Sequence, residues 1–330
     1  MEAVVHPFYG APRPRDTRLR PIFTFFEHEI CEDVEVLDAE EIGVRGTQKR
    51  MRIIISQDDD AEEHIKSRRG VLGYGVGSSD IAEICNFGMK ALVKHFWEYL
   101  VWMPPQEFTT NDPIDHGNHF EGLVRCVYEM ISCERCYDGN MWRIYTPWIA
   151  ELFKDEPKLA FEMESCSPDA TLLFELLIDD ATTSCIDKVR GGVEFKAPYG
   201  DLYPDIPIYH LFQVMWQIYT LNVPFIDYCA VKIGRLQDEE NCGKVYAILW
   251  IRVHRSAPFI KRMLAMVQEF LHCVIERRKP SWGEERGTRE EENEWRGLAR
   301  NELKFRGECP SDIAENAHRY WERHRDQRQW

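Results

Sequence analysis

The amino-acid sequence predicts an α/β protein with a central mixed sheet flanked by helices. Two observations lead to this prediction. Apolar residues recur at helical spacing in some segments and form short β-rich runs in others, and the two kinds of segment alternate as helix, strands, helix, strands. The chain has 330 residues, of which 44% are hydrophobic. This length and composition suffice for a large buried core.

The elements that we expect, in chain order, are a strand pair at 22–29 and 51–56, helices at about 80–101 and 120–131, strands at 142–149, 159–163, 171–178 and 192–195, a helix at 209–221, strands at 225–233 and 245–253, and a helix at 259–276. The first helix is predicted because Ser78, Ser79 and Asp80 are typical of a helix N-terminus and precede apolar residues at helical spacing. Each predicted strand is a β-rich run bounded by turn residues.

The two ends of the chain are expected to lie outside the main domain. Residues 1–60 carry scattered prolines and end in an acidic run, so they are predicted to form an N-terminal extension with little core of its own. Residues 281–330 are rich in Arg, Glu and Trp and predict a helical tail, which packs back on the domain or mediates self-association. The main domain is therefore predicted over 61–280.

Composition excludes several classes of protein. No segment approaches the roughly 20 apolar residues of a membrane helix, and the first residues lack the pattern of a secretory signal, so we expect no membrane partner. Eleven cysteines spread through the chain are typical of free thiols in a reducing, intracellular compartment. A net charge of −15 argues against binding nucleic acid through bulk charge, so such binding needs a local groove.

The most informative segment is Gly-Gly-Val-Glu-Phe-Lys-Ala-Pro at 191–198. On a strand, residues two apart point to the same face, so Glu194 and Lys196 are expected side by side while their sequence neighbours enter the core. Taken alone, such a pair is more typical of an ion pair on an exposed strand. Asp169, in a Ser-Pro-Asp turn, is expected to add a second carboxylate at a strand edge beside Glu194. Two carboxylates and a lysine favour a hydrated site for Mg²⁺ or Mn²⁺, because these hard cations bind oxygen ligands.

Five short motifs occur together in the order Gly77-Ser78-Ser79-Asp80-Ile81-Ala82, Gly117-x-x-x-Glu121, Ser167-Pro168-Asp169, Glu194-Phe195-Lys196-Ala197-Pro198 and Gln213 within 209–219. Their joint order resembles the family of phage lambda exonuclease and the YqaJ-type viral recombinases, within the PD-(D/E)xK nucleases. The resemblance covers about 68–233 and implies a PD-(D/E)xK nuclease core.

The resemblance implies a metal-dependent nuclease that hydrolyses phosphodiester bonds of duplex DNA from a 5′ end, in recombination or repair, often beside a single-strand annealing protein. The residues that correspond to the metal site are Asp169, Glu194, Glu121 and the main-chain carbonyl of Phe195, with Mg²⁺ or Mn²⁺ as the ion. Lys196 corresponds to the residue that positions and activates the attacking water. Gln213 corresponds to the glutamine that orients the water or the lysine.

The resemblance also implies a site for a terminal 5′-phosphate. Ser79 and Ser167 correspond to its contacts, and a helix N-terminus at Ser79 would favour an anion, although Ser79 can also simply cap its helix. The family places an arginine just before the Gly-Ser segment, whereas an insertion at 70–76 separates that segment from Arg68 and Arg69, either of which can serve. Further candidates for a basic rim are Lys66, Lys90, Lys94, Lys188 and Arg190. The resemblance further implies a viral protein in the nucleus or cytoplasm of a host cell, and a homo-oligomer.

Three alternatives stay open at this point. An endonuclease would use the same site, and a DNA-binding or assembly protein would keep the fold without cutting. A zinc-stabilised interaction module would use His116, His119, Cys133 and Cys136, whose order is reversed relative to common zinc fingers. The glycine-rich run at 70–77 lacks the Gly-Lys-Ser/Thr ending of a nucleotide-binding loop, which excludes that reading.

Overall fold

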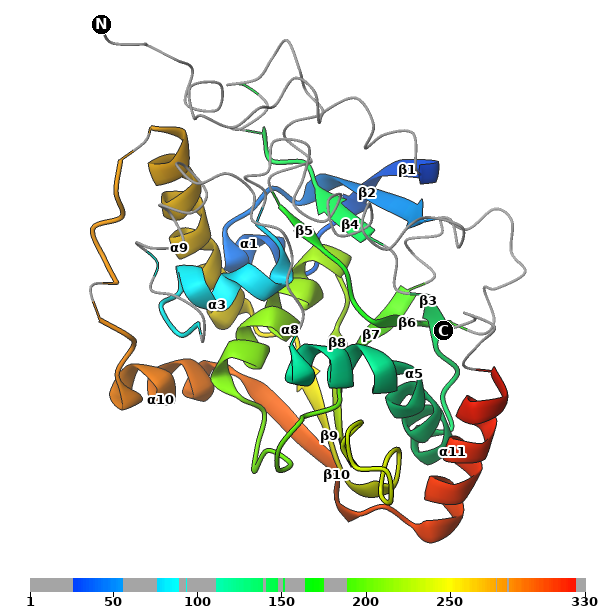
Figure 1. Ribbon diagram of the computed structural model, residues 1–330. Helices are drawn as coiled ribbons and strands as arrows, with labels where there is room; N and C mark the ends of the chain where they lie inside the picture. The colour runs from blue at the N-terminus through cyan, green and yellow to red at the C-terminus, as the bar shows by residue number, and fades with distance from the viewer. Residues whose placement is uncertain are drawn as a thin grey trace, which may run out of the picture.

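The structure is a computed structural model that describes residues 26–55, 76–88, 93, 111–138, 141–147, 151, 164–174, 189–276, 278–283 and 285–324. In the described part, a six-stranded mixed sheet has the strand order β10-β9-β8-β7-β6-β3, and helices lie on both of its faces (Figure 1). The predicted α/β class with a central mixed sheet flanked by helices is therefore confirmed.

The strands of the main sheet are β3 (Tyr137–Asp138), β6 (Ala170–Leu173), β7 (Val189–Lys196), β8 (Phe225–Ile233), β9 (Val245–His254) and β10 (Arg300–Glu308). Strand β7 pairs antiparallel with β6 and parallel with β8. Two consecutive parallel strands need a long crossover connection, and α8 (Ile208–Leu221) supplies it. This crossover places α8 directly over the strand that carries Glu194 and Lys196.

The sheet separates two hydrophobic cores. On one face, α8, α9 (Ala257–Ile275) and α10 (Arg289–Leu298) contribute to a core that includes Tyr228 and Ala230 of β8. On the other face, α5 (Asp112–Ser132) and α11 (Ser311–His324) pack over the alternate residues Cys229 and Val231. Because side chains alternate along a strand, the apolar residues of β8 are divided between the two cores.

A second sheet contains β1 (Phe26–Glu35), β2 (Thr47–Ile55), β4 (Met141–Ile144) and β5 (Ser165–Cys166), and α1 (Ala39–Ile42) lies between its first two strands. The predicted N-terminal strand pair is present as β1–β2, antiparallel and with shifted bounds. Strand β2 also pairs with β4, so residues 26–55 share a sheet with part of the predicted main domain. The turn Ser167–Asp169 leads from β5 to β6 and connects the two sheets.

The predicted helix at 80–101 is confirmed only in part among the described residues, where 81–84 and Val93 are helical. A 3-10 turn, η2 (Ser78–Asp80), is followed by α3 (Ile81–Ile84), and the helix ends there. Asn86 has a φ of 66°, which a right-handed helix does not allow. Most of the remainder lies outside the described residues, as do the strand at 159–163 and the end of that at 171–178.

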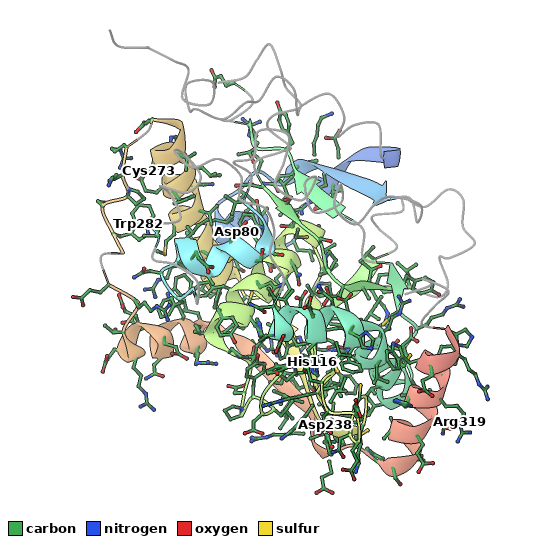
Figure 2. The ribbon with its side chains drawn as sticks, in the orientation of Figure 1. Asp80, His116, Asp238, Cys273, Trp282 and Arg319 are labelled. Atoms are coloured by element: carbon green, nitrogen blue, oxygen red, sulfur yellow. The ribbon has the colours of Figure 1, made fainter. Side chains whose placement is uncertain are left out.

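The tail packs back on the domain. It contains the expected helices α10 and α11, and between them β10, which the sequence did not predict, pairs with β9. Trp295 is buried against the rings of Phe212 and Phe259, and Trp321 packs beside Phe120. Ahead of α10, the Trp282 indole donates a hydrogen bond to the Ile84 carbonyl at 3.1 Å (Figure 2). Two of the tail tryptophans that could have formed an external interface are therefore internal.

Two expectations from composition can be compared with the structure. Within the described ranges, no helix has the length and apolar character needed to cross a membrane. The nine cysteines whose side chains the structure describes are free thiols, and six of them are buried. This agrees with the expected reduced cysteines.

Candidate active site

Strand β7 turns Glu194 and Lys196 to the face covered by α8, as the alternation predicted. The intervening Phe195 and the preceding Val193 are 4% and 0% exposed and belong to the core under α5. The two glycines that precede them in β7 allow close packing, because a Cβ on Gly191 would lie 2.7 Å from the ring of Phe225. The end of β7 is thus fixed between two layers of helices.

Glu194 is held by three donors. Its Oε1 accepts hydrogen bonds from the Lys196 ammonium and from the side-chain amide of Gln213, and its Oε2 accepts one from Gln217 at 2.7 Å. Glu194 is only 1% exposed, so the expectation of a hydrated position is wrong for this carboxylate. The sequence analysis missed Gln217, although it lies four residues after Gln213 and hence on the same face of α8.

Asp169 lies beside this group because β6 pairs with β7. Its Oδ2 accepts a hydrogen bond from the main-chain N–H of Phe195 at 2.6 Å. Burial raises the pKa of Asp169 well above its usual range, and the charges of Glu194 and Glu121 raise it further, while Lys196 and the Phe195 N–H act in the opposite direction. The three carboxylates are thus close enough to repel one another.

Lys196 carries a stable positive charge. Burial alone would lower the pKa of this ammonium, but the carboxylates of Glu194, Asp169 and Glu121, together with the hydrogen bond to Glu194, raise it above its usual value. The Lys196 side chain keeps 25% of its surface exposed, so it can contact a bound ligand while it donates to Glu194. An ammonium that stays charged stabilises negative charge and orients water, and it does not act as a base.

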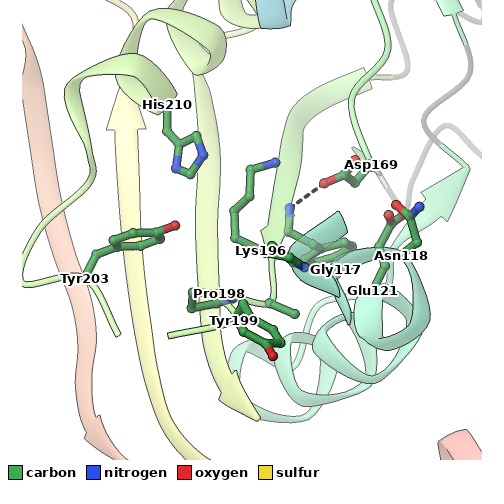
Figure 3. A pocket seen from close by; sticks show the side chains of 12 residues that line it. Gly117, Asn118, Glu121, Asp169, Lys196, Pro198, Tyr199, Tyr203 and His210 are labelled. Atoms are coloured by element: carbon green, nitrogen blue, oxygen red, sulfur yellow. Dashed lines mark hydrogen bonds between the residues drawn. The ribbon is translucent and has the colours of Figure 1, made fainter. Parts of the chain in front are cut away.

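Asp169, Lys196 and Glu121 line a cavity of about 260 Å³, which we term the site pocket (Figure 3). It is lined by Pro113, Gly117, Asn118, Glu121, Asp169, Phe195, Lys196, Ala197, Pro198, Tyr199, Tyr203 and His210. Glu121 and Gly117 reach it from α5, as the motif on that predicted helix required. Glu121, Asp169, Glu194, Lys196, Phe195 and Gln213, which come from α5, the turn before β6, β7 and α8, are therefore brought together.

The sequence analysis missed the aromatic side of the site pocket. Tyr199 and Tyr203 lie in the loop between β7 and α8, and His210 lies in the first turn of α8. The Arg235 guanidinium lies 4.6 Å from the centre of the Tyr199 ring. No sequence motif singles these residues out, because the loop that folds them over the end of β7 has no regular periodicity.

The oxygen atoms at the site pocket are the type of ligand that a hard divalent cation binds, although they do not form a complete coordination shell. In the described part of the chain, no three His, Cys, Asp or Glu side chains are grouped closely enough to hold a metal. Mg²⁺ commonly binds through one or two carboxylates and keeps several waters, so a three-residue cage is not required. Mutual repulsion among Asp169, Glu194 and Glu121 is the electrostatic situation that a bound cation relieves.

Two solved structures resemble the chain at a distance. A crystal structure of an alkaline exonuclease, LHK-Exo, from Laribacter hongkongensis shares 18% identity over 66% of this chain and 95% of that chain, with a TM-score of 0.42. The structure of LHK-Exo in complex with dAMP shares 16% identity over 62% and 90%, with a TM-score of 0.40. No protein-family model and no curated protein matches the chain. A likeness at this level assigns neither a family nor a function.

Of the residues predicted to bind a 5′-phosphate, the structure describes only the two serines, and neither is at the site pocket. Ser79 is exposed on η2 and Ser167 is partly buried ahead of Asp169, and neither lines the cavity. Arg68 and Arg69 lie outside the described residues, as do Lys66, Lys90, Lys94 and Lys188. Arg190 is engaged elsewhere, with the carbonyl of Leu173 and the carboxylate of Glu134.

The proposed zinc ligands do not converge. His116, labelled in Figure 2, is fully buried and contacts the rings of Phe120 and Tyr199. His119 lies against Trp321. Cys133 is exposed and Cys136 is buried. All four residues are described, and no metal-binding group of three forms among the described side chains. The structure therefore gives the zinc alternative no support.

Proposed function

We propose that the chain is a deoxyribonuclease dependent on Mg²⁺ or Mn²⁺ that hydrolyses phosphodiester bonds. The observation that supports this proposal is that Lys196, Asp169 and Glu121 line one pocket, while Glu194 lies directly behind it, hydrogen-bonded to Lys196 and Gln213. These residues are separated by up to 92 positions, from Glu121 to Gln213, and they are the residues on which the sequence resemblance rests.

The chemistry assigns each side chain a task. Asp169, Glu194 and the main-chain carbonyl of Phe195 would hold the cation, with Glu121 completing the site directly or through water. A divalent cation at such a site offsets charge on a phosphate and lowers the pKa of water. The Lys196 ammonium orients the attacking water and stabilises the negative charge that develops on the phosphate. Gln213 and Gln217 fix the Glu194 carboxylate, so that it does not rotate during the reaction.

The proposed mode of action is exonucleolytic, from the 5′ end of duplex DNA. This mode follows from the sequence resemblance, and duplex ends are therefore the proposed substrate. An annealing-protein partner, a homo-oligomer and a location in the nucleus or cytoplasm of a host cell stay predictions from the resemblance.

The proposal is tested with linear and covalently closed circular duplexes of one sequence, incubated with Mg²⁺, with Mn²⁺ or with EDTA. We expect the linear duplex to be degraded only with a metal, and the closed circle to survive. Cutting of the circle would instead indicate an endonuclease. Asp169→Ala should abolish cleavage, whereas Asp33→Ala, which removes an exposed carboxylate on β1, should not.

A second measurement addresses the cation directly. Calorimetric titration with Mn²⁺ should show binding to the wild-type protein and to Asp33→Ala, and loss of binding in Asp169→Ala. Equal Mn²⁺ binding by all three proteins would remove Asp169 from the metal site. Absence of any cleavage by a folded, Mn²⁺-binding wild-type protein would favour a DNA-binding or assembly protein that no longer cuts.

A further inference from the structure

His210 enters the site pocket from α8 and is not part of the motif set discussed above. It lines the cavity together with Lys196 and Asp169, although only 9% of its surface is exposed. In the view of Figure 3, Lys196 lies between His210 and Asp169. Lys196 and His210 therefore face the same cavity, where one bound substrate can contact both side chains.

One ring nitrogen of His210 is already engaged. Nδ1 lies 2.8 Å from the hydroxyl of Tyr228, which is fully buried on β8. Burial raises the pKa of the Tyr228 hydroxyl well above its usual value, so this group keeps its proton. Among the described residues, Nδ1 is the hydrogen-bond partner of that hydroxyl. The hydroxyl is satisfied when it donates to Nδ1, and in this arrangement the ring proton resides on Nε2.

The orientation of the ring is also fixed by packing. The rings of Tyr209 and Tyr203 meet His210 edge-on, with centroid separations of 4.3 Å and 5.7 Å. A side chain held in this way loses little conformational entropy when it binds a ligand. The imidazole is thus a preoriented group rather than a mobile one.

His210 is neutral in these surroundings. Burial lowers its pKa well below the usual value, and the positive charge of Lys196 lowers it further. A neutral imidazole can lie next to the Lys196 ammonium without repulsion between two cations. It can also present its remaining N–H to an anion that the ammonium attracts.

From these observations we propose that the Nε2–H of His210 donates a hydrogen bond to a phosphate oxygen of the bound DNA, on the side of Lys196 away from Asp169. This inference rests on the proposed nuclease function and extends it, because it names a substrate contact outside the set of residues that carries the resemblance. His210 binds and orients the phosphate, and Tyr228 acts through His210 as a positioning residue.

Two substitutions separate this role from packing. In His210→Gln the side-chain amide nitrogen can occupy the position of Nε2, so a donor to the phosphate is retained. In His210→Asn the amide reaches only the position of Nδ1, so the contact with Tyr228 is retained and the phosphate donor is lost. We expect kcat/KM on linear duplex to fall roughly 10- to 100-fold in His210→Asn and to stay within about fivefold of wild type in His210→Gln. Equal losses in both variants, or no loss in His210→Asn, would overturn the proposal.

Two readouts do not depend on cleavage. In ¹⁵N NMR spectra of histidine-labelled protein, the His210 signals should show the Nε2–H form, and Tyr228→Phe should mix the two tautomers. An Nδ1–H form in the wild type would overturn the proposal. Thymidine 5′-monophosphate should bind His210→Asn more weakly than it binds the wild type or His210→Gln. Equal affinity for the three proteins would contradict the proposed contact between His210 and phosphate. If the wild type does not cut DNA, the proposed function fails while these two measurements still decide the role of His210.

Discussion

Removing the Glu194 side chain should destabilise the fold as well as abolish the proposed cleavage of DNA. Glu194→Ala removes the acceptor for Gln217, whose side chain is fully buried and whose carbonyl oxygen already lacks a hydrogen-bond partner. A buried donor without an acceptor costs about 1–3 kcal/mol. Gln213 and Lys196 are partly exposed and can turn to water, so they add little. We therefore expect Glu194→Ala to lower the free energy of unfolding by about 1–3 kcal/mol.

Urea unfolding of four proteins measures this effect: wild type, Glu194→Ala, Gln217→Leu and the double variant. Leucine has no donor, so in the double variant nothing is left unsatisfied at position 217. The double variant should therefore be more stable than the sum of the two single changes predicts, by about 1 kcal/mol or more. Asp33→Ala, an exposed control, should change the free energy of unfolding by no more than about 0.5 kcal/mol.

Two results would refute this reasoning. If Glu194→Ala has the urea midpoint of the wild type with the same slope, the carboxylate is not the acceptor that satisfies Gln217. If the effects of the two single changes simply add, Glu194 and Gln217 do not interact. Cleavage is measured separately, and its loss does not bear on either outcome.

Three further predictions concern stability. Asp169→Asn should stabilise the fold more at pH 8 than at pH 4. The reason is that the pKa of Asp169 is raised in the folded state, so the stability that the protonated carboxyl contributes is lost as the pH rises through this pKa. An equal gain in the thermal midpoint at both pH values would contradict this prediction. Burial raises the pKa of Glu164 to about 7, so the stability that it contributes below pH 4.5 should be lost by about pH 7, on the order of 3 kcal/mol. Glu164→Gln keeps an acceptor for Thr146 and should remove this pH dependence of the free energy of unfolding, measured by urea unfolding at several pH values. If the free energy of unfolding changes with pH as in the wild type, Glu164 is not the source of the pH dependence. Trp295→Ala should cost roughly 3–5 kcal/mol in the same assay, and a cost below about 1 kcal/mol would place the tail outside the cooperative fold.

Strands β7, β8 and β9 and helices α8 and α9 could be predicted from the sequence because their apolar runs are long and buried. Strand β8 has the predicted bounds, Phe225–Ile233, and β9 extends the prediction by a single residue. Helix α5 begins at Asp112, well before the predicted start at 120. The side chain of Asn111 accepts a hydrogen bond from the Ile114 N–H and thus caps the helix. That cap is a local signal which the apolar periodicity did not include.

Other features depend on contacts that no single segment contains. Strand β10 has the sequence RNELKFRGE, in which charged residues interrupt the apolar pattern that predicts a strand. It forms because the edge of β9 is available for pairing. The carboxylates of the candidate site were predicted because each stands in a recognisable motif. Gln217 and His210 were missed because their roles arise only when α8 is laid over β7. The burial of Glu194 could not be predicted for the same reason.

The turn Ser167–Asp169 joins the last strand of the small sheet to β6 of the large one. The position of Asp169 consequently depends on both sheets, whereas Glu194 and Lys196 belong to the large sheet alone. A rotation of one sheet against the other would therefore displace the Asp169 carboxylate first. Substitutions in the N-terminal strands, which are far from the site pocket in the sequence, can thereby shift the Asp169 carboxylate.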